Sequence, residues 1–82
     1  MRYKGEISLA RVKREWPHHV ALPAGQVQGK NYDVVHGLAR TLSVAPRTYH
    51  FRRDDVDHVV FCFADPADAD LFRERFNGKR LA

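Results

Sequence analysis

The chain has 82 residues, a net charge of +4 from fourteen Lys and Arg against ten Asp and Glu, and one cysteine. This length suits one small domain with a single core, which we predict to span residues 1–82. The composition excludes an internal disulfide, and no window has the apolar length of a membrane span.

The predicted compartment follows from Cys62 and from the first residues of the chain. Cys62 lies in the apolar stretch VVFCF, which is typical of a packed thiol in a reducing compartment. Residues 1–16 contain no apolar run long enough for a signal peptide. We therefore expect a cytoplasmic protein.

Residues 6–16, EISLARVKREW, are predicted as a first strand that ends at Pro17. Apolar residues fall on both parities, so the strand needs a bulge or partial burial on both faces, and its facing stays open. We place three of them on the helix-covered face: Ala10, Val12 and Trp16.

Residues 18–29, HHVALPAGQVQG, are predicted as a loop or extended segment, because prolines and glycines punctuate their surroundings. Val20 and Leu22 leave open a short extra strand against the core, so the path of residues 17–30 is not determined. A helix is then predicted from a cap at Asn31 to about residue 43. Its buried stripe comprises Val35, Leu38 and Leu42.

Residues 47–53 and 57–63 are predicted as the second and third strands, joined by a hairpin turn. A two-residue turn would place Tyr49 and Phe51 beside His58. A three-residue turn, from Asp54 to Val56, would place Tyr49 and Phe51 on the face of Phe61 instead, which makes one continuous apolar face. Because register follows the buried face, we predict the three-residue turn.

The segment that follows predicts a second helix with clear ends. Asp65 is a favoured N-cap, Pro66 suits the first helical position, and Asn77-Gly78 is typical of a helix stop. One stripe of this helix is apolar, with Ala69, Phe72 and Phe76.

The order strand, helix, strand, strand, helix predicts an α+β fold of the ferredoxin-like split β-α-β type. We expect a three-stranded antiparallel sheet with two helices on one face, and a fourth strand absent or vestigial, because only residues 78–82 remain. The predicted core comprises Ala10, Val12, Trp16, Val35, Leu38, Leu42, Tyr49, Phe51, Val59, Phe61, Phe63, Ala69, Phe72 and Phe76.

The segment FADPADADLFRERFNGKRL, about a quarter of the chain, resembles the end of an RNA recognition motif. That family places an aromatic strand residue, an acidic turn, a helix and Asn-Gly at this spacing. The family's base-stacking aromatics correspond to His58 and Val60 here, so base stacking is not carried over. As a whole, the chain resembles a set of short bacterial proteins of no assigned function.

No paired carboxylates, phosphate loop or metal-ligand spacing occurs in the sequence, so we expect no enzymatic activity, no cofactor and no metal. The five histidines lack the close pairs of zinc sites. Cys62 near His50 or His58 would suit a catalytic thiol, but its strand context favours packing.

The candidate interaction face is the sheet side predicted to lie opposite the helices, which is basic and partly apolar. It comprises Arg11, Lys13, His50, Arg52, His58 and Val60. An uncovered apolar sheet surface usually marks a contact. We therefore expect a protein-interaction module that self-associates through this face or a sheet edge.

Two alternatives stay open for this face. One is weak, sequence-tolerant binding of RNA or single-stranded DNA by its basic residues. The other is a solvated face with no role. A secondary candidate for binding a peptide or a base is the group at the predicted loop entrance: Trp16, His18 and His19.

Overall fold

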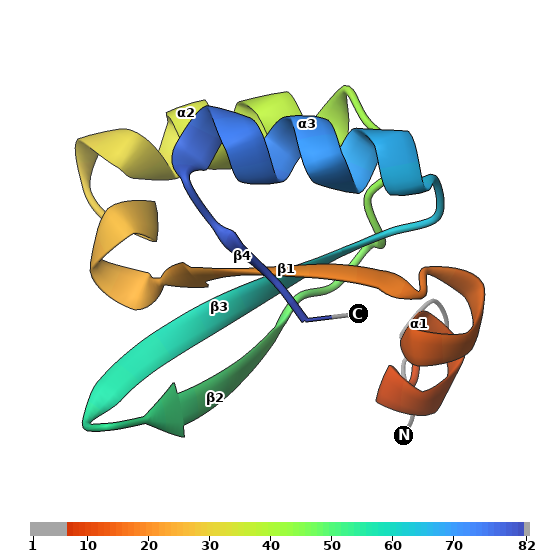
Figure 1. Cartoon of the computed structure of the whole chain (residues 1–82), viewed down its shortest axis with the longest axis horizontal. Coiled ribbons are helices and arrows are strands. Elements are labelled where there is room, and N and C mark those ends of the chain that lie inside the picture. The colour runs from red at the N-terminus through yellow and green to blue at the C-terminus, as the bar shows by residue number, and fades with distance from the viewer. Residues whose placement is uncertain (1–6, 82) are drawn as a thin grey trace, which may run out of the picture.

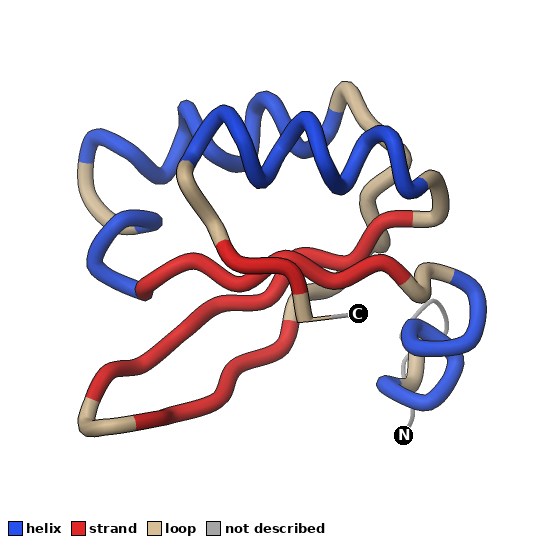
Figure 2. Tube along the Cα trace, viewed as in Figure 1, coloured by secondary structure: helices blue, strands red, loops and turns tan. Residues whose placement is uncertain are grey.

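The structure, a computed structural model, describes residues 7–81. These residues form an α+β fold with three α-helices, a short 3-10 helix and an open antiparallel sheet in the order β2-β3-β1-β4 (Figure 1). Helices α2 and α3 cover one face of the sheet, and α1 lies on the other side (Figure 2). The elements are α1 (Leu9–Glu15), β1 (His18–Pro23), η1 (Ala24–Val27), α2 (Lys30–Arg40), β2 (Tyr49–Arg53), β3 (Val56–Phe63), α3 (Pro66–Phe76) and β4 (Lys79–Arg80).

The main core lies between the sheet and the helices α2 and α3. Strands β1 and β3 bury Val20, Leu22, Val59, Phe61 and Phe63 there. The helices contribute a further set, of which Leu38 and Phe76 are partly buried: Val35, Leu38, Ala39, Ala69, Phe72 and Phe76. Leu42, predicted in the helical stripe, is also partly buried there but lies in the turn after α2. The predicted burial of both helical stripes is therefore confirmed.

The predicted first strand is wrong, because Leu9–Glu15 is helix α1. The Ser8 hydroxyl accepts a hydrogen bond from the Arg11 amide at 3.2 Å and caps the helix, and Arg11 pairs with Glu15 one turn later at 2.9 Å. Val12 and Trp16 lie one turn apart on one side of this helix, a spacing that places two side chains on one face of a helix and of a strand alike.

The segment predicted as a loop contains the central strand of the sheet. β1 pairs with β3 over all six of its residues and with β4 on its other side. Val20 and Leu22 are fully buried, so the alternative of an extra strand was the correct one. The sheet therefore has four strands rather than three, although β4 is only two residues long.

The helix predicted from Asn31 to residue 43 is α2, which runs from Lys30 to Arg40. Gly29 occupies the N-cap position and makes no side-chain cap, so the predicted cap at Asn31 is wrong. In α3 the predicted ends are confirmed. The Asp65 carboxylate accepts a hydrogen bond from the Ala67 amide at 2.9 Å, and Asn77, rather than Gly78, takes the left-handed conformation that ends the helix.

The hairpin turn has two residues, so the predicted three-residue turn is wrong. Arg53 pairs with Val56, and both turn residues are left-handed, with φ of 53° at Asp54 and 64° at Asp55. Such turns match the twist of the flanking strands. Tyr49 and Phe51 consequently face away from α2 and α3, and their predicted place in the main core is wrong.

A second core cluster explains why this register is stable. Helix α1 covers part of the opposite sheet face, so Tyr49 and Phe51 have apolar neighbours there. Val12 and Trp16 also belong to this cluster and not to the main core, and Ala10 is exposed. The buried members are Ile7, Val12, Ala21, Ala45, Val60 and Cys62.

Candidate interaction site at the free edge of the sheet

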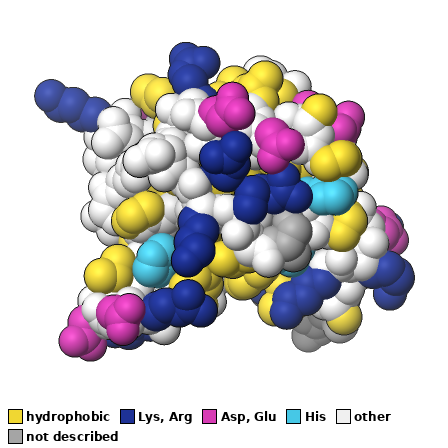
Figure 3. Space-filling view, in the orientation of Figure 1, with side chains coloured by type: hydrophobic (Ala, Val, Ile, Leu, Met, Phe, Trp, Pro, Cys, Tyr) yellow, Lys and Arg dark blue, Asp and Glu magenta, His cyan; other side chains and the backbone are white. Residues whose placement is uncertain are grey.

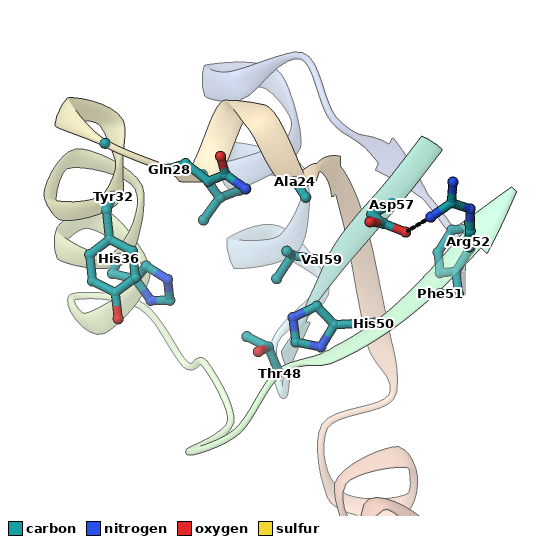
Figure 4. A pocket seen from close by; sticks show the side chains of 12 residues that line it. Ala24, Gln28, Tyr32, His36, Thr48, His50, Phe51, Arg52, Asp57 and Val59 are labelled. Atoms are coloured by element: carbon teal, nitrogen blue, oxygen red, sulfur yellow. Dashed lines mark hydrogen bonds and ion pairs between the residues drawn. The ribbon is translucent and has the colours of Figure 1, made fainter. Parts of the chain in front are cut away.

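A groove of about 930 Å³ separates α2 from the β2–β3 hairpin. Tyr32 and His36 project from α2 toward it, and His50 projects from β2 on the facing wall (Figure 4). Ala24 and Val59 add apolar surface between the walls. A second hollow adjoins this one near Arg40 and Arg47, and we call the two together the α2–β2 groove.

The α2–β2 groove continues toward the end of α2. This second hollow, of about 740 Å³, shares Tyr32, His36 and Thr48 with the first and extends to Arg40 and Arg47. The groove therefore follows the whole helix-facing side of β2.

Strand β2 is an edge strand that pairs with β3 alone within residues 7–81. A two-residue turn closes on a hydrogen-bonded pair, here Arg53 with Val56, and such pairs alternate along an antiparallel ladder. Phe51 therefore directs its backbone groups to β3, whereas His50 and Arg52 direct theirs outward. Unpaired groups of this kind are a template for another strand.

The two ends of this edge differ in charge. The turn carries Asp54 and Asp55, and acidic side chains gather over the hairpin tip at the lower left of Figure 3. Arg52 lies 3.2 Å from Asp57 but 4.0 Å from Asp55, whose side chain is 96% exposed. At the other end, Arg47 has no acidic side chain within 4.0 Å among the described residues, and it donates a hydrogen bond to the Ile7 carbonyl at 3.0 Å.

The α2 wall of the groove is aromatic. The His36 ring lies 4.2 Å from the Tyr32 ring and 5.2 Å from the Phe61 ring, measured between centroids. Burial, followed by the nearby Arg40 charge, lowers the pKa of His36, while Asp33 opposes the shift. A neutral imidazole near pH 7 thus packs in this wall. The described residues contain no group of three or more side chains that could hold a metal ion.

The predicted interaction face is not one surface. Arg11 and Lys13 belong to α1, where Lys13 Nζ lies 5.5 Å from the centre of the Tyr49 ring. His50 and Arg52 line the groove on the opposite side of the sheet. His58 stacks on Phe51 on the α1 side, and Val60 is fully buried there. Because the turn has two residues and α1 covers part of the sheet face opposite α2 and α3, the residues of the predicted interaction face lie on separate surfaces.

The secondary candidate is largely structural. His19 is 5% exposed, and its Nδ1 lies 2.8 Å from the Tyr49 hydroxyl while its Nε2 lies 3.1 Å from the Trp16 carbonyl oxygen. Both ring nitrogens therefore have partners. Half-buried His18 instead lies beside Arg80, with 3.3 Å between their nitrogens, so His18 and His19 do not form one site.

Cys62 is fully buried, and burial raises the pKa of its thiol to about 11. A thiol of this kind holds little of the reactive thiolate at neutral pH. This environment supports the packing interpretation of Cys62 over that of a catalytic nucleophile.

Sequence reasoning missed the groove because it placed His50 and Arg52 on the wrong face of the sheet. The alternation of polar and apolar residues along β2 was the available signal, but the turn length decides which face of the sheet its polar side chains occupy.

Comparison with protein-family models, curated proteins and solved structures finds no match for this chain. Within the described part of the chain, no helix is long and apolar enough to cross a membrane.

Proposed function

We propose that this protein is a non-enzymatic interaction module that binds an extended segment of a partner protein by strand addition at β2. One observation carries the proposal: the outward backbone groups of His50 and Arg52 lie on an edge that no other strand of residues 7–81 pairs with, beside a long groove. Main-chain pairing at a sheet edge supplies affinity, and adjacent pockets supply specificity.

The α2–β2 groove supports this function because it suits the alternation of an added strand. Every second side chain of that strand would point toward the groove, between α2 and β2. Apolar Val59 and aromatic Tyr32 could contact such side chains, and His50 could donate or accept hydrogen bonds.

We also propose a fold type and a cellular location for this protein. The order β1, α2, β2, β3, α3, β4 supports a ferredoxin-like description of the sheet and its two covering helices. The buried reduced thiol of Cys62 supports a cytoplasmic location.

The test uses a heptapeptide library of random sequence displayed on phage, with the full chain as bait. Synthetic copies of the selected peptides are then titrated into the labelled protein. We expect them to slow hydrogen exchange at the amides of His50 and Arg52. The His50→Pro variant should bind at least about tenfold more weakly, because proline removes an outward N–H and blocks the edge.

The matched control is His50→Ala, which removes the same side chain but keeps the N–H. It should retain most of the affinity. Equal losses in both variants would assign binding to the imidazole and reject strand addition. Selection of no peptide, or of peptides that shift only the α1 side of the sheet, would also reject the proposal, as would binding of mixed-sequence RNA at this edge in place of any peptide.

A further inference from the structure

We propose that a second copy of this chain occupies the β2 edge, so that two β2 strands pair antiparallel about a twofold axis at Phe51. This inference rests on the proposed function, since it uses the same edge. The inference identifies the added strand as β2 of a second copy, whereas the proposed function leaves the partner protein unidentified. A twofold interface requires a surface that is complementary to itself, and the β2 edge has that property.

The register follows from which backbone groups point outward. His50 and Arg52 offer their N–H and C=O groups, so a symmetric pair must join outward residues to outward residues. Placing Phe51 on the axis joins His50 to Arg52 of the second copy. All five residues of β2 then pair, and this is the longest overlap that the strand allows.

The neighbouring symmetric registers bring like charges together. An axis at Arg52 places the two Arg52 side chains opposite each other. An axis at His50 places Arg53 opposite Arg47 of the second copy. Directly opposed like charges destabilise a strand pair. The axis at Phe51 avoids both contacts.

With Phe51 on the axis, the charged ends of the edge become complementary. Arg47 of each copy then approaches the acidic turn of the other, Asp54-Asp55, just beyond the paired residues, and symmetry forms this contact twice. Within residues 7–81, Arg47 has no acidic side chain within 4.0 Å, and the ion pair of Asp55 with Arg52 is long, at 4.0 Å. The His50 imidazole meets an Arg52 whose charge Asp57 already balances at 3.2 Å.

The remaining contacts of this arrangement are compatible with burial. The two Phe51 rings become neighbours on the α1 side, each still stacked on its own His58 at 4.7 Å. An axis perpendicular to the sheet keeps both α2 helices on the same face. The two α2–β2 grooves then join into one channel above an eight-stranded sheet.

The test is analytical ultracentrifugation of the full chain over a dilution series from millimolar to micromolar protein. We expect a monomer–dimer equilibrium that weakens as salt is raised. Arg47→Asp and Asp55→Arg should each weaken self-association by about tenfold or more, because each places two like pairs across the axis. Mixing these two variants should restore association, since both pairs in the mixed dimer are then opposite in charge.

Asp55→Asn is the neutral control, because asparagine tolerates the left-handed turn conformation, and it should weaken association less than Asp55→Arg. Thermal unfolding of each variant shows that it is folded. A monomer at all concentrations would overturn this inference, but peptides that bind at His50 and Arg52 would still support strand addition. A dimer unaffected by either charge reversal, or a mixture that stays dissociated, would reject this register.

Discussion

Gly78 lies where strand β1 leaves no room for a side chain. A Cβ atom added there would lie 2.8 Å from both Leu22 Cδ2 and Val20 Cγ1, and 3.1 Å from the Ala21 carbonyl oxygen. We therefore expect Gly78→Ala to lower the free energy of unfolding in urea by about 1–3 kcal/mol. Gly78 is thus needed for close packing, whereas Asn77 supplies the left-handed end of α3.

The matched control is Gly37→Ala in α2, where an added Cβ would meet nothing within 4 Å. Gly37 is therefore not needed for close packing on the sheet. Alanine has the higher helix propensity, so this variant should gain up to about 1 kcal/mol. Equal effects of the two substitutions would contradict the packing argument.

His19 predicts a pH dependence of stability. Burial is the main cause that lowers its pKa from the ordinary value of 6.5, and the nearby Lys13, His18 and Arg80 charges act in the same direction. The hydrogen bond to the Trp16 carbonyl opposes this shift, because it raises the pKa of His19. The unfolded chain therefore binds the proton more readily. The stabilisation from neutral His19 is complete above its unfolded pKa and is lost as pH falls through the lower folded pKa.

The measurement is the free energy of unfolding between pH 8 and pH 5, which we expect to fall below a pH of about 6.5. His36 also has a lowered pKa, so a His36→Gln background isolates the effect of His19. An NMR titration of His19 should give a midpoint below 6.5. A midpoint at or above that value would contradict the neutral His19–Tyr49 hydrogen bond.

At the scale of elements, α1 is a seven-residue helix held to the sheet mainly by its buried residue Val12. Val12 and Cys62 belong to the same cluster, so loosening α1 should expose the thiol. We expect Val12→Ala to cost about 2 kcal/mol and to speed the reaction of Cys62 with a thiol reagent by about tenfold.

Arg14→Ala is the control for this experiment, because the Arg14 side chain is 70% exposed on the same helix. It should leave the rate of Cys62 modification nearly unchanged. Slow modification in both variants would mean that α1 is not what shields the thiol.

At the scale of the whole molecule, burial on both faces distinguishes the central strands from the edges. β1 and β3 lie between the two core clusters, whereas β2 has an open edge and β4 has two residues. Buried central strands open only with global unfolding. Amides of Val20, Leu22 and Phe61 should therefore exchange slowest, and those of His50 and Arg52 should exchange fast in dilute protein. Fast exchange at β1 would contradict its central position.

The sequence by itself determined the elements whose signals are local. The two ends of α3 are set by contacts within a few residues, at Asp65, Pro66 and Asn77. The apolar stripes of α2 and α3 follow from helical periodicity. The strand pattern of residues 57–63 likewise depends on neighbouring side chains. These features need no knowledge of the rest of the chain.

Tertiary structure decided the rest, because the competing local patterns were close in quality. Residues 9–15 carry apolar side chains compatible with a strand or a helix, and a buried position for Val12 under the sheet selected the helix. That helix covers the second face, which in turn makes room for Tyr49 and Phe51 there. The turn length, the facing of β2 and the α2–β2 groove all agree with this cover by α1, a long-range contact that sequence periodicity does not encode.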